Sequence, residues 1–495
     1  MREQLSIIPK PVSVKYNEGF FKSESLPDII KKECAQEQFG ADTDKVFEAY
    51  RLIIEKDRIT AEAPADAGMH HCMETFRQLT LSGFKDGVLT LPCAEITDYP
   101  RFSWRGFMLD CSRYFYSVLF IKNLLDVLSL HHINRFHWHL TDDQGWRFKV
   151  AEYPLLTEIG SLRKNYRIPD LPPSGGFYTE DEIRDVVNYA SVRHIEVIPE
   201  VDLPGHASAI LASYPEFGCT GGPYEVEERF GIFEDVLCAG NDRIFDLAEK
   251  VFDTLAGLFP SKWVHIGGDE VLYNRWEACP KCRSRLKELG LKRPAELQSW
   301  ITFKLVQMLS EKHKTAIGWD EILGTSNETP NHGFGDDSCP DGARQLKLPK
   351  EAVVMSWRGD EGGIKAARLG HEVIMSPCTG GCYLDYKQQD SREEPGALYA
   401  KASTVLKSYS MDPVPALMNE KDAKYVIGGQ GNLWSELIYA GKIAEYMIFP
   451  RMCAIAESLW TPKDKKDFDD FSKRLIIHRE RLDNLGINQY RGSLC

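Results

Sequence analysis

The chain has 495 residues, 43% of them hydrophobic, and it carries a net charge of −13 with a pI near 5.6. This length allows a large hydrophobic core, so we expect one large domain and a smaller one. The acidic balance argues against nucleic acid or an anionic membrane surface as a partner, and no apolar run reaches the roughly 20 residues that span a bilayer.

The first part of the chain, residues 1–98, predicts a small α/β accessory domain. Its strand-like runs are IIPKPVSVKY, RLIIEKDRITAEAP and GVLTLPCAEI, and the remainder has space for one or two helices. The chain begins MREQLSIIPKP, without the apolar stretch of a secretory signal, and its thirteen cysteines follow no disulfide-like spacing. We therefore expect a cytoplasmic protein; a secreted protein whose signal has been removed is the alternative.

From about residue 101 the sequence alternates short apolar runs with amphipathic stretches, a pattern typical of repeated βα units. Strands are expected at 106–109, 135–140, 195–201, 263–266, 315–319, 352–357, 372–375 and 425–428. Helices are expected at 117–131, 180–193, 243–258, 295–312, 362–369 and 440–459. These units predict a (β/α)8 TIM barrel over residues 99–465, followed by a helical extension, 466–495, packed on the barrel. The Gly- and Pro-rich segment 324–350, with the glycosylation-like Asn327-Glu-Thr329, is expected to be an insertion over one barrel mouth.

Polar and aromatic residues gather just after the expected strands. In chain order they are Asp110, Arg113, Asp142, Asp143, Asp202, His206, Asp269, Glu270, Trp319, Trp357, Tyr383 and Trp434. Because the active site of such a barrel forms at the carboxyl ends of its strands, we expect these side chains to converge on one pocket.

The sequence His265-Ile-Gly-Gly-Asp-Glu270 is the sharpest local feature. Its glycines let backbone segments approach closely, and its neighbouring carboxylates raise each other's proton affinity, as acid and base catalysis requires. An isolated Asp-Glu pair is usually a solvated turn. The position of this pair after a barrel strand favours a catalytic role.

The aromatic residues at the strand ends indicate a sugar pocket. Trp319, Trp357 and Trp434 are placed for stacking on sugar rings, whereas most tryptophans belong to a core. Arg113, Asp385 and Glu436 supply polar groups for hydroxyls.

Two patterns point instead to metals. His137-Trp-His139 resembles the paired histidines of metal-dependent barrel hydrolases, which gives the alternative function: a metal-dependent TIM-barrel hydrolase using His137 and His139. Cys279-Pro-Lys-Cys282 has the spacing of half a zinc site, but no second pair of this spacing follows. We therefore interpret these cysteines as two loop thiols and expect no metal and no cofactor.

Six segments in order resemble glycoside hydrolase family 20. They are RGFMLDCSRYF (105–115), NRFHWHLTDDQGWR (134–147), EVIPEVDLPGH (196–206), HIGGDE (265–270), GWDEIL (318–323) and GNLWSE (431–436). The family often has histidine where Tyr114 stands here. The resemblance implies an exo-acting, retaining β-N-acetylhexosaminidase that acts by substrate-assisted catalysis, in which the acetamido group of the sugar forms an oxazolinium intermediate.

The resemblance also implies a role for each site residue. Glu270 is the general acid and base, Asp269 assists the acetamido group, and Tyr383 bonds the acetamido oxygen. Trp319 and Trp357 are walls and Trp434 is the platform, while Arg113, Asp385 and Glu436 bind hydroxyls; Asp142, His206 and Asp202 lie behind Glu270. The expected substrate is a small oligosaccharide or glycoconjugate with terminal β-linked GlcNAc or GalNAc, and a catalytically inactive sugar-binding protein is a third possibility. The sequence does not set the oligomeric state.

Overall fold

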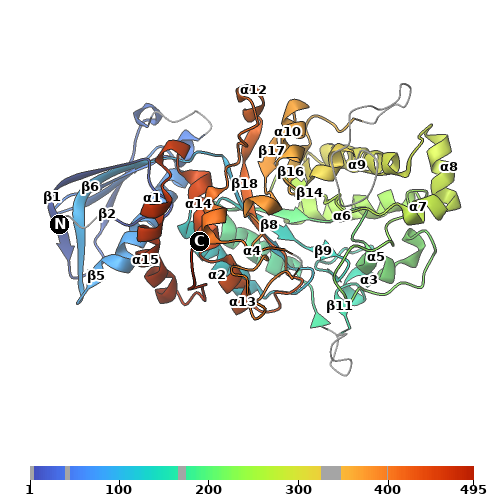
Figure 1. The fold of residues 1–495 in the computed structure, drawn as a ribbon, viewed down its shortest axis with the longest axis horizontal. Helices are drawn as coiled ribbons and strands as arrows, with labels where there is room; N and C mark the ends of the chain where they lie inside the picture. Colours follow the sequence, from blue (N-terminus) through green and yellow to red (C-terminus); the bar gives the residue numbers. More distant parts are fainter. Residues whose placement is uncertain (1–4, 40–44, 165–173, 325–346, 399) are drawn as a thin grey trace.

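A computed structural model describes residues 5–39, 45–164, 174–324, 347–398 and 400–495. The chain forms an amino-terminal sheet domain and a closed barrel beside it (Figure 1). Most of the expected insertion, residues 325–346 with Asn327 and Thr329, lies outside the described residues.

The amino-terminal domain is a six-stranded sheet covered by one long helix. The strands are β1 (Ser13–Ser23), β2 (Ile29–Glu33), β3 (Tyr50–Ile54), β4 (Ile59–Ala63), β5 (Phe84–Lys85) and β6 (Val88–Asp98), in the order β1-β6-β3-β4-β2 with β5 beside β6. Alternation along β3 buries Tyr50, Leu52 and Ile54 on one face. Helix α1 (Asp66–Gly83) packs on the sheet through its apolar stripe, which includes Cys72 and Phe76.

The second domain is a closed barrel of eight parallel strands, so the predicted TIM barrel is confirmed. The strands are β7 (Trp104–Asp110), β8 (Arg135–His139), β13 (Glu196–Glu200), β14 (Trp263–His265), β15 (Thr315–Trp319), β16 (Val353–Ser356), β17 (Val373–Met375) and β18 (Val426–Leu433). Strand β18 extends five residues beyond the expected end at Gly428. Its glycines have poor strand propensity, but pairing with β7 along Gly428–Leu433 closes the barrel and overrides that preference.

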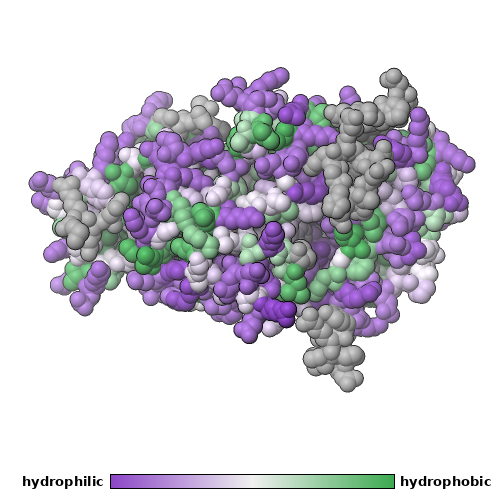
Figure 2. All heavy atoms as spheres, in the orientation of Figure 1, coloured by the Kyte–Doolittle hydropathy of each residue, from purple (hydrophilic) through white to green (hydrophobic). Residues whose placement is uncertain are grey.

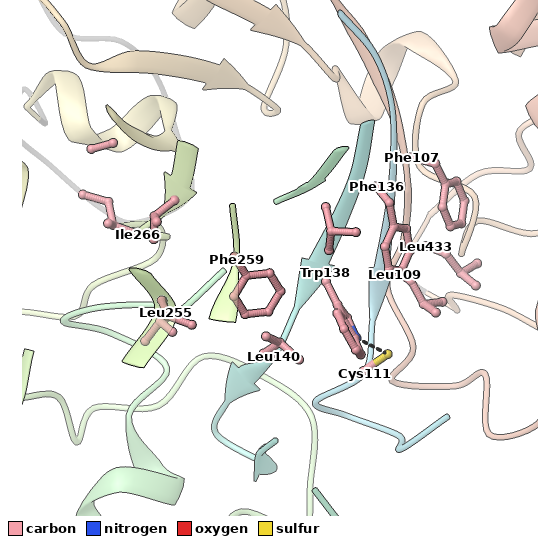
Figure 3. Close-up of a cluster of buried hydrophobic side chains, with 14 of the residues drawn as sticks. Phe107, Leu109, Cys111, Phe136, Trp138, Leu140, Leu255, Phe259, Ile266 and Leu433 are labelled. Atoms are coloured by element: carbon pink, nitrogen blue, oxygen red, sulfur yellow. Dashed lines mark hydrogen bonds between the residues drawn. The ribbon is translucent and has the colours of Figure 1, made fainter. Parts of the chain in front are cut away.

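Alternation along β8 divides its side chains between the barrel interior and the surrounding helices. Phe136 and Trp138 face outward into the main apolar cluster, where Trp138 Nε1 donates to Cys111 Sγ at 3.3 Å (Figure 3). His137 and His139 therefore face the barrel interior, a direction that the sequence alone left open.

Helices cover the barrel. They include α2 (Val118–Leu130), α4 (Glu180–Ser191), α6 (Arg243–Leu258), α8 (Pro280–Glu288), α9 (Pro294–Glu311), α10 (Glu361–Arg368), α13 (Gly441–Ile448) and α14 (Arg451–Trp460). Shorter helices are α3 (Leu155–Glu158), α5 (Ser208–Ser213), α7 (Asn274–Ala278), α11 (Val405–Ser410) and α12 (Glu420–Ala423). The single helix expected at 440–459 is two helices, α13 and α14. The break falls at Phe449-Pro450 because proline has no N–H to continue the helical hydrogen bonds.

The final helix, α15 (Phe468–Asn484), lies between the two domains (Figure 1). Arg474 pairs with Glu457 of α14 at 2.7 Å, and Arg481 donates to Ser82 and Gln78 of α1. The helix thus contacts the accessory domain as well as the barrel. Among the described residues, no helix is long and apolar enough to cross a membrane.

The apolar cluster around Trp138, between the barrel strands and the helices, leads to a prediction about stability. Trp138→Ala removes a fully buried indole and should lower the free energy of unfolding by about 3–5 kcal/mol, as measured by urea denaturation. Leu119→Ala is the control, because Leu119 of α2 is 69% exposed. Equal destabilisation by both substitutions would contradict the assignment of Trp138 to the core.

Candidate active site

The turn after β14 places Asp269 and Glu270 at the carboxyl end of the barrel. Gly267 and Gly268 have φ angles of +64° and +93°, and Glu270 itself has a φ of +51°. A side chain on Gly267 would overlap the carboxylate of Asp202, which accepts a hydrogen bond from the Gly268 N–H at 2.9 Å. Asp202 therefore fixes a turn that only glycine accommodates at position 267.

Burial sets the proton affinity of the carboxyl groups at this turn. Burial, together with the charges of Asp202 and Glu270, raises the pKa of Asp269 well above its usual range. Burial also raises the pKa of Glu270, and it raises the pKa of Asp202 to about 6. Three carboxyl groups that hold protons unusually well thus lie around one turn, as general acid catalysis near neutral pH requires.

His206 lies behind the two carboxyl groups. Its Nε2 is 3.7 Å from Glu270 Oε2 and 3.8 Å from Asp269 Oδ2, while its Nδ1 is 3.2 Å from Asp142 Oδ1 and 3.0 Å from Asp143 Oδ2. Burial opposes a charge on this ring, but Asp142 and Asp143 raise its pKa well above the ordinary value. A charged His206 stabilises the ionised forms of Glu270 and Asp269 in turn.

Arg113 occupies the other side of Asp142. Its guanidinium is 2.8 Å from Asp142 Oδ2, 3.3 Å from Asp110 Oδ2 and 4.0 Å from Glu436 Oε1. The same group lies 5.0 Å from the ring centroid of Trp434. Arg113 thus joins the carboxylates at one edge of the site to its aromatic part.

Four aromatic residues at or after β15 to β18 form that part. Trp357 and Tyr383 are stacked with ring centroids 6.1 Å apart and an interplanar angle of 13°. Trp434 lies 5.8 Å from Trp319 and 6.3 Å from Tyr383. Rings from four barrel segments therefore make one apolar surface.

Asp385 and Glu436 complete the predicted set near Tyr383 and Arg113. Asp385 Oδ1 is buried and has no hydrogen-bond partner among the described residues. Burial, reinforced by Glu436, raises the pKa of Asp385 well above its usual range. A buried oxygen without a partner is suited to a ligand hydroxyl. The structure thus connects the twelve residues to which the family resemblance assigns a role.

Residues outside the predicted set also support the site. Glu200 at the end of β13 accepts a hydrogen bond from Trp319 Nε1 at 3.0 Å, and Glu321 accepts one from Trp357 Nε1 at 3.0 Å. Gln144 accepts a hydrogen bond from Arg113 Nε at 3.0 Å. All three lie at or just after strands, so their position along the chain was the available signal, but nothing local identified their partners.

The two histidines of the metal-dependent alternative lie beside buried carboxylates. Both ring nitrogens of His139 are engaged by carboxylates, Nδ1 by Glu200 at 2.5 Å and Nε2 by Asp142 at 3.0 Å. His137 Nδ1 accepts from Gln430 at 3.0 Å, and its Nε2 lies 2.8 Å from Glu200. Each ring thus has a carboxylate beside it, and the ligand atoms of His137, Glu200 and His265 lie close enough together to hold a metal ion.

The interpretation of Cys279 and Cys282 as two loop thiols is wrong. Cys279 directly precedes α8 and Cys282 lies within it, and both adjoin Cys219 and Cys238 from an earlier segment. The partners of the pair are separated from it by 40 residues or more along the chain, so no local spacing revealed them.

Comparisons with known proteins show that the chain matches a known family. The model of the glycosyl hydrolase family 20 catalytic domain matches residues 102–463, and domain 2 of that family matches residues 30–99. A β-hexosaminidase of Porphyromonas gingivalis is 41% identical over 90% of this chain, which spans 54% of that protein. A β-hexosaminidase of Akkermansia muciniphila is 33% identical over 96% of this chain and 90% of its own length.

Solved structures of similar proteins cover almost the whole chain. The exo-β-N-acetylglucosaminidase of Vibrio harveyi in complex with N-acetylglucosamine has a TM-score of 0.83 and 31% identity, covering 98% of this chain and 78% of that one. A Streptomyces plicatus β-hexosaminidase mutant in complex with its product GlcNAc has a TM-score of 0.81 and 27% identity, covering 99% and 97% of the two chains.

The glycine turn generates a prediction about activity. Gly267→Ala should displace Asp202 or the turn and lower kcat/KM about 100-fold, because a shift of about 1 Å at a catalytic group has that effect. Gly257→Ala in α6 is the matched control, since nothing lies within 4 Å of its added methyl group. A folded Gly267→Ala variant with unchanged kcat/KM would show that the turn does not position the site.

Proposed function

The chain belongs to glycosyl hydrolase family 20, and from that membership we propose that it is an exo-acting, retaining β-N-acetylhexosaminidase. Its substrate is a small oligosaccharide or glycoconjugate that ends in β-linked GlcNAc or GalNAc. The observation that carries the proposal is the placement of the buried Asp269 and the half-buried Glu270, whose carboxyl groups both have raised pKa values, beside His206 at the barrel mouth.

The first chemical step uses the substrate's own acetamido group. Its carbonyl oxygen attacks the anomeric carbon while the bond to the leaving oxygen breaks, and Glu270 gives its proton to that oxygen. A cyclic oxazolinium ion results, and no carboxylate of the enzyme attacks the sugar. The distance between the two carboxyl groups therefore does not indicate the stereochemical outcome, as it does in other glycosidases. In the second step Glu270, now a carboxylate, takes a proton from water, which attacks the anomeric carbon and restores the β configuration.

Asp269 stabilises the intermediate. Its Oδ1 is buried and accepts no hydrogen bond from the described residues, so it is available for the acetamido N–H. A positive charge that develops on the acetamido group favours the ionised form of Asp269 and is stabilised by it.

The aromatic surface holds the sugar. Trp319 and Trp357 flank the acetamido group, Tyr383 donates its O–H to the acetamido oxygen, and Trp434 stacks beneath the ring. Arg113 and the carboxyl groups of Asp385 and Glu436 bind the sugar hydroxyls. Because all these groups surround one terminal sugar, the site releases residues from a chain end.

Substrates with and without the acetamido group test the proposal. We expect nitrophenyl N-acetyl-β-glucosaminide to be hydrolysed about 1,000-fold faster than nitrophenyl β-glucoside, or more, since intramolecular attack replaces a bimolecular step. Steady-state kinetics measure the ratio. Equal rates would contradict the substrate-assisted mechanism, and no hydrolysis of either would favour an inactive sugar-binding protein.

Substitutions of the two carboxyl residues should give different kinetic signatures. Glu270→Gln removes the proton donor and should lower kcat/KM by about 10²–10⁴-fold for poor leaving groups and less for nitrophenolate. Asp269→Asn keeps the donor, so its loss should depend little on the leaving group. Identical leaving-group dependence in the two variants would contradict the assigned roles.

The pH profile gives an independent readout of Glu270. Its pKa is raised, so the protonated acid persists above the ordinary glutamate value of about 4.3, and activity is lost as the pH rises through the raised value. Glu270→Gln should abolish this alkaline limb of kcat/KM.

A further inference from the structure

Four cysteines from three segments of the chain converge beside the active-site barrel. Cys219 follows the 3-10 turn Pro215–Phe217, Cys238 ends a long loop, and Cys279 and Cys282 lie at the start of α8. Three of the four are buried, and all four sulfur atoms lie within 4.8 Å of one another.

Three of the six separations between these sulfur atoms match those of a metal-thiolate tetrahedron. They are 3.6 Å for Cys238–Cys282, 3.8 Å for Cys219–Cys282 and 3.9 Å for Cys238–Cys279. Zinc–sulfur bonds of about 2.3 Å place the sulfurs of a regular tetrahedron about 3.8 Å apart. A disulfide would require about 2.05 Å, and thiol packing alone does not require four sulfurs to surround a common centre.

The backbone around the sulfurs is built to hold them together. An antiparallel bridge between Gly218 and Leu237 joins the two backbone segments that carry Cys219 and Cys238, and the Cys238 N–H donates to the Phe217 carbonyl at 2.8 Å. Gly240 packs directly on the turn of the Cys-x-x-Cys segment, where an added methyl group would come within 2.6 Å of the Cys282 nitrogen. These contacts orient the ligands as surrounding hydrogen bonds do in metal sites.

We propose that Cys219, Cys238, Cys279 and Cys282 bind one structural zinc ion. A tetrahedral set of four thiolates favours zinc among the divalent metals and leaves no position open for water or substrate. The ion therefore takes no part in glycoside hydrolysis.

The position of the four cysteines gives the ion a function. The 219–238 loop has no helix or strand, apart from the bridge at Leu237, yet its backbone contacts two residues of the site region. The Glu227 N–H donates to the Asp143 carbonyl at 3.1 Å, and Gln144 Nε2 donates to the Arg229 carbonyl at 2.8 Å. Zinc would join both ends of this loop to the segment that follows Glu270, and would hold the loop against the barrel mouth.

Metal analysis of the wild-type protein is the direct test. Protein purified without metal-affinity resin, chelator or added zinc should contain about one zinc per chain by mass spectrometry. X-ray absorption should find four sulfur neighbours at about 2.3 Å. Less than a tenth of an equivalent of zinc, iron in its place, a disulfide between these cysteines, or nitrogen and oxygen neighbours at the metal would each overturn the proposal.

A cysteine variant tests the loop. Cys282→Ser should lower the zinc content at least tenfold and increase tryptic cleavage after Arg229 at least tenfold. Cys93→Ser is the matched control, because Cys93 is also buried but lies in β6 of the accessory domain. Unchanged zinc content in Cys282→Ser would contradict the ligand assignment; if this variant does not fold, the zinc content and absorption spectrum of the wild type still decide.

Discussion

The buried charges along one side of the barrel interior constrain everything around the site. A carboxylate removed from water must be paired with a cation or remain protonated, because an unpaired buried charge is very costly. His139 contacts Glu200 through one ring nitrogen and Asp142 through the other. Asp142 also pairs with Arg113 and His206. Charges therefore alternate from the centre of the barrel to its mouth.

This alternation of charges ends at Asp269 and Glu270, where the neighbouring cations do not compensate for the burial of both carboxylates. Burial raises the pKa of both groups more than His206 lowers it. These two carboxyl groups therefore keep their protons at a higher pH than ordinary carboxyl groups do. Catalysis by proton transfer uses carboxyl groups with such raised pKa values, whereas a fully paired network of charges only stabilises the fold. The same carboxylates that order Arg113 beneath the mouth also bring its guanidinium over Trp434, which joins the charged and aromatic halves of the site.

Segments outside the barrel strands hold this arrangement in place. Helix α15 bonds α14 and α1, so the accessory domain and the barrel share one polar seam. On the other side, the 219–238 loop contacts Asp143 and Gln144, which adjoin His206 and Arg113. A zinc ion at the four cysteines would fix that loop without contributing any chemistry.

The sequence by itself determined the barrel and supplied candidates for the site. Strand and helix periods are local, and active-site residues of this fold follow their strands directly, so Asp269, Glu270 and Trp434 could be predicted as candidates from their positions after strands. The tertiary structure decided what depends on distant partners. The side of β8 that His139 faces, the pairing of Glu200 with Trp319, and the meeting of Cys219 and Cys238 with Cys279 and Cys282 all arise from contacts between residues far apart in the chain. Barrel closure likewise extended β18 through glycines that favour no strand, because pairing with β7 outweighs local propensity.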